Sequence, residues 1–199
     1  VEIRKAKESE LDLLMEIYGI ARAFMVRTGN PGQWKDSYPG EERIREDISW
    51  GICYVCVEDG VIEGVFSYLP GPDPTYQRID DGQWLNEEPY GVVHRLAGRG
   101  HVHGVAACCL EWAFARCGNL RIDTHRNNHV MRHILEKKRV CALRDDLCGG
   151  RKPENCLSEN CGGRRAGRAE DPDGQRESSG KRKESESKGQ RISGMCWII

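Results

Sequence analysis

Hydrophobic residues over positions 1–138 follow two spacings, one typical of strands and the other typical of helices. The alternating spacing predicts strands at residues 2–6, 52–58, 61–69, 90–97 and 119–124. The helical spacing predicts helices at residues 11–28, 41–50 and 104–116, and one that begins at Asn127 or Asn128. A hairpin followed by a β-α-β unit argues for an α/β fold in which helices cover a mixed sheet.

Local signals mark where several of these elements begin and end. Ser9 and Asp12 form an S-x-x-[DE] capping pattern before the first predicted helix. The dipeptide Asp59-Gly60 predicts a tight turn between the second and third strands. Residues 70–89 open with prolines and carry few apolar residues, so we expect an ordered excursion between the third and fourth strands.

The composition narrows the class of protein. A chain of 199 residues, 38% of them hydrophobic, is long enough for one domain with a core. A formal net charge of -1 gives no argument for binding nucleic acid or an anionic membrane. No apolar run approaches the roughly 20 residues of a membrane span. The N-terminus lacks the apolar segment of a signal peptide, so a cytoplasmic protein is expected.

The cysteines divide into two groups. Within strand or helix patterns, where we interpret them as small buried hydrophobic residues, lie Cys53, Cys56, Cys108, Cys109 and Cys117. The C-x-x-C pair lies on a predicted strand, where positions three apart face opposite sides. The cysteines after residue 138 do not follow a zinc-binding spacing. We therefore predict no metal site.

A glycine-rich turn, residues 98–104, joins the fourth predicted strand to the third predicted helix. The N-terminus of a helix presents unpaired N–H groups and the positive end of the helix dipole, which suit an anionic phosphate. The alternative is that these glycines serve only to make the bend.

In this position, residues 101–106 resemble the [Q/R]-x-x-G-x-[G/A] motif of the GNAT superfamily of N-acetyltransferases. Gly104 and Ala106 match the motif, whereas His101 stands where glutamine or arginine is usual. A second family signature begins at Asn128, and Leu135 stands where many members carry a tyrosine proposed to protonate the leaving thiolate. The resemblance covers residues 2 to about 138, and residues 120–125 are similar to a bacterial subgroup.

The resemblance implies transfer of an acetyl group from acetyl-CoA to a primary amine of a small molecule or peptide. The residues it implies for CoA binding are Leu96, Ala97, Gly98, His101, Val102, His103, Gly104, Val105, Ala106 and Asn128. The candidate catalytic residues, each with a structural or exposed role as its alternative, are His94, Asp123 and His125; strand parity places the last two on one face. The aromatic residues expected to form substrate walls, with capping of the core as the alternative for the first two, are Trp34, Tyr38, Tyr76 and Trp84.

Other functions stay open at this point. Without the tyrosine at Leu135, the chain could be a non-catalytic CoA-binding or scaffold protein. It could also be a product that does not function as written. No nucleic acid, membrane or metal partner is expected, and a homodimer is left open.

Residues 139–199 do not continue the family pattern, which has Gly-Phe after Lys138 and then two closing strands. A shift of one nucleotide permits Gly-Phe and a strand, an Asp-Gly turn and a strand in another reading frame. We therefore hypothesise a frameshifted tail, and the DNA sequence after Lys138 tests it. From residue 162 to 190, Pro172 aside, no apolar residue is larger than alanine, so a mostly disordered tail is expected. The first domain would then be a GNAT fold over residues 1–138 that lacks its last two strands and exposes the edge of the fifth.

Overall fold

The computed structural model describes residues 1–35, 37–76, 84, 86–137, 141–142 and 195–198. The α-helices are α1 (Leu11–Arg27), α2 (Glu41–Ser49), α3 (Val105–Cys117) and α4 (His129–Lys137). Two single-turn 3-10 helices are η1 (Glu8–Glu10) and η2 (Pro74–Tyr76). The strands are β1 (Glu2–Lys5), β2 (Cys53–Glu58), β3 (Val61–Pro70), β4 (Gly91–Gly98), β5 (Leu120–Thr124), β6 (Cys141–Ala142) and β7 (Met195–Ile198). The element order predicted for residues 2–137 is confirmed.

These strands form one mixed sheet in the order β1-β2-β3-β4-β5-β7-β6. All neighbouring pairs are antiparallel except β4 and β5, which are parallel because α3 connects them. The predicted α/β fold class is therefore confirmed. None of the helices within the described residues combines the length and apolar composition that a membrane span requires.

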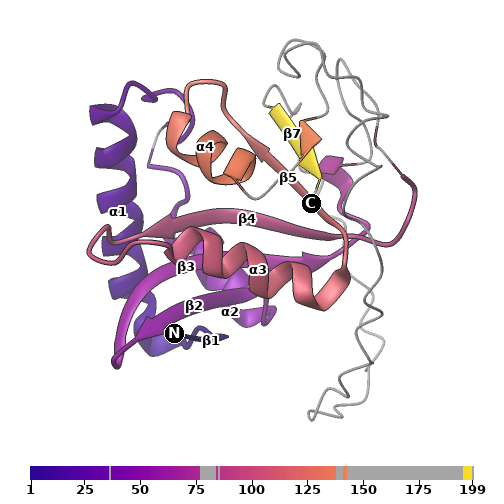
Figure 1. Ribbon diagram of the computed structural model, residues 1–199. Helices are drawn as coiled ribbons and strands as arrows, with labels where there is room; N and C mark the ends of the chain where they lie inside the picture. The colour runs from indigo at the N-terminus through magenta and orange to yellow at the C-terminus, as the bar shows by residue number, and fades with distance from the viewer. Residues whose placement is uncertain (36, 77–83, 85, 138–140, 143–194, 199) are drawn as a thin grey trace, which may run out of the picture.

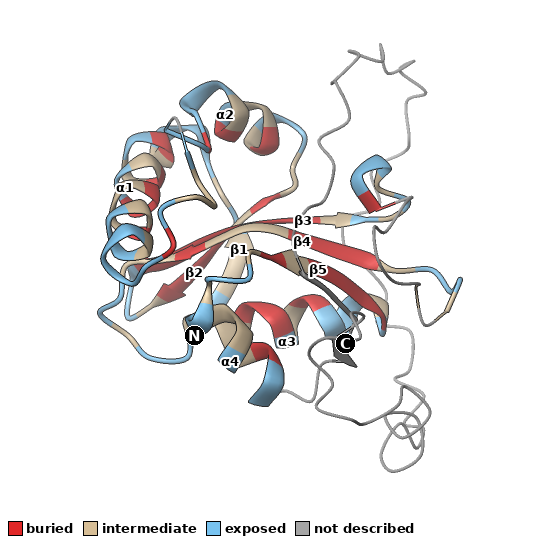
Figure 2. Ribbon diagram, turned by 90° about the horizontal axis from the view of Figure 1, so that it is seen from above, coloured by how far each residue is buried: buried red, intermediate tan, exposed pale blue. Residues whose placement is uncertain are grey.

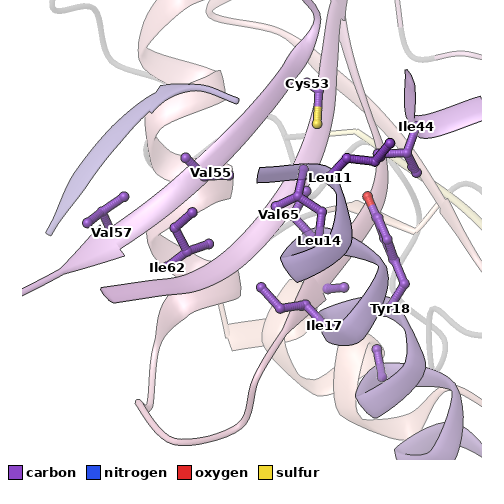
Figure 3. Packing of buried hydrophobic residues seen from close by; sticks show 12 residues of the cluster. Leu11, Leu14, Ile17, Tyr18, Ile44, Cys53, Val55, Val57, Ile62 and Val65 are labelled. Atoms are coloured by element: carbon purple, nitrogen blue, oxygen red, sulfur yellow. The ribbon is translucent and has the colours of Figure 1, made fainter. Parts of the chain in front are cut away.

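Helices cover both faces of the sheet, with α1 and α2 on one face and α3 and α4 on the other (Figure 2). On the first face, Leu14 and Ile17 of α1 pack with Val55, Ile62 and Val65 of β2 and β3 (Figure 3). On the second face, α3 and α4 bury a separate cluster of apolar residues, namely Cys109, Leu110, Ala113 and Leu135, against Phe66, Val93, Leu120 and Ile122. The sheet is thus buried between two cores, and Leu135 belongs to the second.

Some local predictions are confirmed and one is wrong. Asp59 and Gly60 both take left-handed φ angles, 50° and 79°, as the tight hairpin turn requires. The Ser9–Asp12 capping pattern is not formed, because α1 begins from Glu10 without a side-chain cap. Instead, the Glu10 carboxylate accepts the main-chain N–H of Lys7 at 2.8 Å and pairs with Arg4 at 2.7 Å.

The edge of β5 differs from the expectation of an exposed strand. β7 pairs with it antiparallel from Arg121↔Ile198 to Thr124↔Met195, and β6 pairs with β7. The expectation of an open edge is therefore wrong along this stretch. Residues 139–140, 143–194 and 199 lie outside the described residues, so the frameshift and the disordered tail stay predictions.

Candidate active site at the separation of β4 and β5

The parallel strands β4 and β5 pair only at their beginnings. Their register joins Gly91 to Leu120 and Val92 to Arg121 and ends there, although β4 continues to Gly98. Figure 1 shows β5 running away from β4 toward α4. Because the N–H of Arg99 donates to the Glu63 carbonyl of β3 at 2.9 Å, the main-chain groups of the preceding residue, Gly98, face the opposite side. Within the described residues, β4 thus has no strand partner on this side beyond Val92.

The glycine turn follows directly from this edge. Gly100 and Gly104 have φ angles of 84° and 86°, a backbone conformation that side chains strongly disfavour. A Cβ atom at either position would meet nothing within 4 Å. Gly104 is the N-cap of α3 and provides no side-chain cap. The first N–H groups of this 13-residue helix therefore donate no hydrogen bond to the side chain of the N-cap residue.

Charged residues surround the turn. His101 and His103 are exposed. The His101 Nδ1 atom lies 3.8 Å from Oε2 of Glu63, whose side chain is buried on β3. Arg99 pairs with Glu16 of α1 at 3.3 Å, while its Nε atom is buried without a hydrogen-bond partner among the described residues. The turn thus offers the Arg99 guanidinium and two exposed histidine rings as donors beside the open end of α3.

A histidine and a carboxylate meet beside the separating strands. His94 of β4 places Nε2 2.9 Å from Oδ2 of Asp73, in the segment between β3 and β4. Thr75 donates to the other carboxylate oxygen through its main-chain N–H at 2.8 Å and its hydroxyl at 2.6 Å. Burial opposes ionisation of Asp73, but the hydrogen bonds from His94 and Thr75 outweigh it and lower its pKa to about 2. Asp73 is therefore an anion at neutral pH and accepts a hydrogen bond from Nε2–H of His94.

Tyr76 joins the two strands at this point. It is fully buried, its ring centroid lies 5.5 Å from that of His94, and its hydroxyl donates to the Asp123 carboxylate of β5. The Trp84 ring lies 5.8 Å from the Tyr76 ring, and the guanidinium of Arg121 lies over Trp84 at 4.2 Å. Two predicted catalytic residues, His94 and Asp123, and two predicted wall residues are thus brought into one cluster.

His125 and Asn128 lie at the end of β5, where the chain turns into α4. The His125 Nδ1 atom accepts the main-chain N–H of Asn127 at 3.2 Å, so its ring closes this turn. Asn128 caps α4, since its side-chain oxygen accepts the N–H of Met131 at 3.1 Å. The amide of Asn128 also donates to Gln33 at 2.9 Å. The helix-cap prediction for Asn128 is confirmed, and Gln33 is a neighbour that the sequence did not indicate.

The remaining aromatic candidates lie on the loop between α1 and α2. Trp34 packs edge-to-face on the buried Tyr18 ring at 5.8 Å and joins the core on that face. Tyr38 is 38% exposed, and its hydroxyl accepts from Nη1 of Arg95 at 3.4 Å. Trp34 therefore caps the core, while Tyr38 presents surface at the rim of the same face.

Comparison with known proteins identifies the family. No protein-family model and no curated protein matches the sequence. Among solved structures, the chain is similar to a GNAT-family acetyltransferase from Streptococcus agalactiae, with 32% identity and a TM-score of 0.65 over 72% of this chain and 86% of that chain. The chain belongs to the GNAT family of acetyltransferases.

Two further solved structures share this GNAT fold. A Staphylococcus aureus protein assigned as an acetyltransferase is 25% identical, with a TM-score of 0.55, over 71% of this chain and 92% of that chain. A GNAT-family acetyltransferase from Listeria monocytogenes is 14% identical, with a TM-score of 0.53, over 76% and 89%. Membership supports an acyltransferase that uses an acyl-CoA. Among the described residues, no group of three or more His, Cys, Asp or Glu side chains could hold a metal ion.

Asp73 and Arg95 also lie at this site, and the hydrophobic pattern of the sequence does not place either of them there. Asp73 lies among prolines, where no periodicity indicates which side chains turn inward. Arg95 is buried on β4, with a side-chain exposure of 6%. A signal for Arg95 was present: the adjacent polar residues His94 and Arg95 interrupt the alternation expected of a strand. Such an interruption indicates a bulge as readily as a surface position.

Proposed function

We propose that this GNAT protein is an acetyl-CoA-dependent N-acetyltransferase that acts on a primary amine of a small molecule or peptide. One observation carries the proposal: β4 loses its parallel partner after Val92 and leads directly into the uncapped N-terminus of α3. An extended thiol-bearing chain can pair with such a strand edge. Its phosphates can accept hydrogen bonds from the first N–H groups of the helix.

The residues at this position fit the acyl donor. The main-chain groups from Leu96 through Ala97 to Gly98 would pair with the arm that carries the thioester. The pyrophosphate would be held by the turn that runs through His101, Val102, His103, Gly104, Val105 and Ala106, where missing Cβ atoms leave room at the left-handed glycines. Asn128, at the start of α4, would contact the cofactor from the side opposite the glycine turn. When bound, acetyl-CoA supplies the acetyl group as a thioester.

His94 is the base that the geometry supports best. Amide formation makes a C–N bond, breaks the thioester C–S bond and moves one proton from the amine to the leaving thiolate, which departs as the thiol. An anionic Asp73 accepts a hydrogen bond from Nε2–H of His94, so the tautomer that makes this bond has its lone pair on Nδ1. That atom can accept the amine proton during attack. Asp123 already accepts a hydrogen bond from Tyr76, so we assign it to holding the site together rather than to proton removal.

The acceptor would enter on the sheet face that carries α1 and α2. The Tyr76 ring packs beside His94, Trp84 packs on Tyr76, and Tyr38 contacts Arg95, the next residue along β4. Their apolar rings favour an amine on a carbon skeleton, and the residue that first contacts it is Tyr38, because it is the most exposed of the three. The partners expected are amine substrates, in the cytoplasm.

A second candidate, a CoA-binding protein without turnover, is favoured by one observation. Leu135, at the position of the family's tyrosine, is fully buried in the core formed by α3 and α4 and offers no proton donor. In an acetyltransferase, the leaving thiolate would then take its proton from water or from His94.

Release of free thiol from acetyl-CoA, measured with a panel of primary amines and N-terminal peptides, separates the two functions. We expect turnover with at least one amine, and a fall in kcat of about 100-fold or more for His94→Gln. His133→Gln, an exposed histidine on α4, is the matched control and should keep wild-type kcat. Binding of acetyl-CoA without turnover would support the second candidate.

A further inference from the structure

β4 contains a bulge beside the proposed base. The antiparallel register joins Ser67 to His94 and Val65 to Ala97, so β4 uses one more residue than β3 over this interval. Arg95 lies in the extra stretch with a φ of 53°, in the left-handed region that residues with a Cβ atom seldom adopt. A bulge of this kind persists only where its surroundings hold it in place.

A buried ion pair holds this bulge to α2. Nη2 and Nε of Arg95 lie 2.5 and 2.9 Å from Oδ2 of Asp47, whose side chain is fully buried. Ser67 donates its hydroxyl to the same carboxylate oxygen at 2.6 Å. Ser67 is also the register partner of His94 on β3. One carboxylate on α2 therefore fixes the bulge residue and the strand position opposite the base.

The ion pair also reaches the rim of the acceptor face. Arg43, one helical turn before Asp47, places Nε 3.3 Å from the second carboxylate oxygen. On the other side, Arg95 donates from Nη1 to the hydroxyl of Tyr38 on the α1–α2 loop at 3.4 Å. The network thus connects α2, β3, β4 and the loop that carries the most exposed wall residue.

We propose that Arg95 and Asp47 are a positioning pair that holds the β4 bulge in register, so that His94 meets Asp73 and the edge at Leu96–Gly98 accepts the acyl-CoA. This role rests on the proposed function. If the bulge were lost, the pairing of β4 with β3 would shift by one residue. Each side chain after the bulge would then point to the other face of the sheet. Ala97, which is buried in the α1-side core, and the main-chain direction of Gly98 would then change.

Stability alone does not account for a buried pair of this kind. Replacing both partners of a buried ion pair by well-packed hydrophobic residues is often neutral, whereas removing one partner leaves an unpaired buried charge. A purely structural pair should therefore be replaceable as a unit without loss of activity. A positioning pair should lose activity whether it is removed singly or as a unit.

The test compares Asp47→Leu, Arg95→Met and the double variant D47L/R95M in the full chain. The single variants should lower Tm by roughly 10 °C, and the double variant should recover most of that loss. In all of them, kcat should fall by about 10-fold to 100-fold, and the affinity for acetyl-CoA, measured by calorimetry, should fall several-fold. Ile44→Val, in the buried core of the same helix, is the matched control that lowers Tm without changing kcat or affinity.

Each outcome is decisive. A double variant that recovers both Tm and wild-type kcat and affinity overturns the positioning role and leaves the proposed function intact. A parallel fall of kcat and Tm in the Ile44→Val control would also overturn it, because activity would then follow stability. If the wild-type protein transfers no acetyl group to any amine, the proposed function fails, and the positioning role fails with it.

Discussion

Tyr76, on the single turn η2, donates a hydrogen bond from its hydroxyl to the carboxylate of Asp123 on β5. The Tyr76 ring lies against His94 on β4, so one side chain links the two strands at the point where their pairing has ended. Tyr76 and Asp123 therefore supply a connection between β4 and β5 that the backbone lacks there. A buried hydrogen bond to a charged acceptor is among the stronger single contacts in a fold.

Replacing Tyr76 by phenylalanine removes this bond and keeps the ring beside His94. We expect the free energy of unfolding to fall by about 1–3 kcal/mol, because the carboxylate keeps its charge and loses its partner. Asp123→Ala should cost less in the Y76F background than in the wild type, with a coupling of about 1 kcal/mol. Urea unfolding of the four proteins measures this cycle. Additive losses would show that the hydroxyl and the carboxylate do not depend on each other.

Asp73 makes stability depend on pH in the acid range. Its pKa is about 2 in the folded protein, against 3.8 ordinarily, because the hydrogen bonds from His94 and Thr75 outweigh the effect of burial. Between about pH 4 and pH 2 the unfolded chain binds this proton and the folded chain does not, so the contribution of Asp73 is present above that range and is lost as pH falls through it.

Asp73→Asn should therefore flatten the dependence of unfolding free energy on pH between about pH 2 and pH 4. The change should be smaller than the ~1.4 kcal/mol per pH unit that one proton can contribute, since water reaches part of the carboxylate and screens it. Thr75→Ala removes one of the donors and should flatten the slope less. Urea unfolding at a series of pH values measures both variants, and a slope unchanged in Asp73→Asn would contradict the assignment.

The parts of the fold that depend on neighbouring residues follow from the sequence. The spacing of Leu14, Ile17 and Tyr18 predicts the buried face of α1, and Asp59-Gly60 predicts the hairpin turn. Both involve residues a few positions apart, whose geometry is set by the local backbone. The pairing of β7 with β5 joins residues more than seventy positions apart, and no local pattern indicates it.

The candidate site likewise combines features that the local sequence predicts with features that only the tertiary fold creates. His94, Asp123 and the glycine turn were predicted, because they lie on periodic elements or in a recognisable motif. The partner of His94 was not, since Asp73 is brought in by the excursion after β3. Asp47 was also missed, although its place one turn after Ile44 on a charged helix puts it on the inward face. A charged residue at an inward position is a signal that a buried partner exists, but the partner itself comes from the tertiary fold.

Gly104 should matter for ligand binding as well as for the backbone. Alanine at this φ of 86° should cost about 1 kcal/mol of stability, since the left-handed conformation is strained by a Cβ atom. Gly60, at the β2–β3 hairpin with a φ of 79° and equally open space around it, is the matched control. Both variants should lose similar stability in urea unfolding, but only Gly104→Ala should weaken acetyl-CoA binding in calorimetry, by about 10-fold. Equal affinities in the two variants would remove the turn from the binding site.

Gly64 on β3 lets the first turn of α3 approach the sheet. A Cβ atom there would lie 2.5 Å from Cγ1 of Val105 and 3.1 Å from the carbonyl oxygen of Ala97. Gly64→Ala should therefore cost about 1–3 kcal/mol and move the N-terminus of α3, with a fall in acetyl-CoA affinity. Val105→Ala removes the clashing methyl group, so G64A/V105A should be more stable than G64A and should regain affinity. A double variant no more stable than G64A would show that the strand backbone at Ala97, and not the helix, sets the spacing.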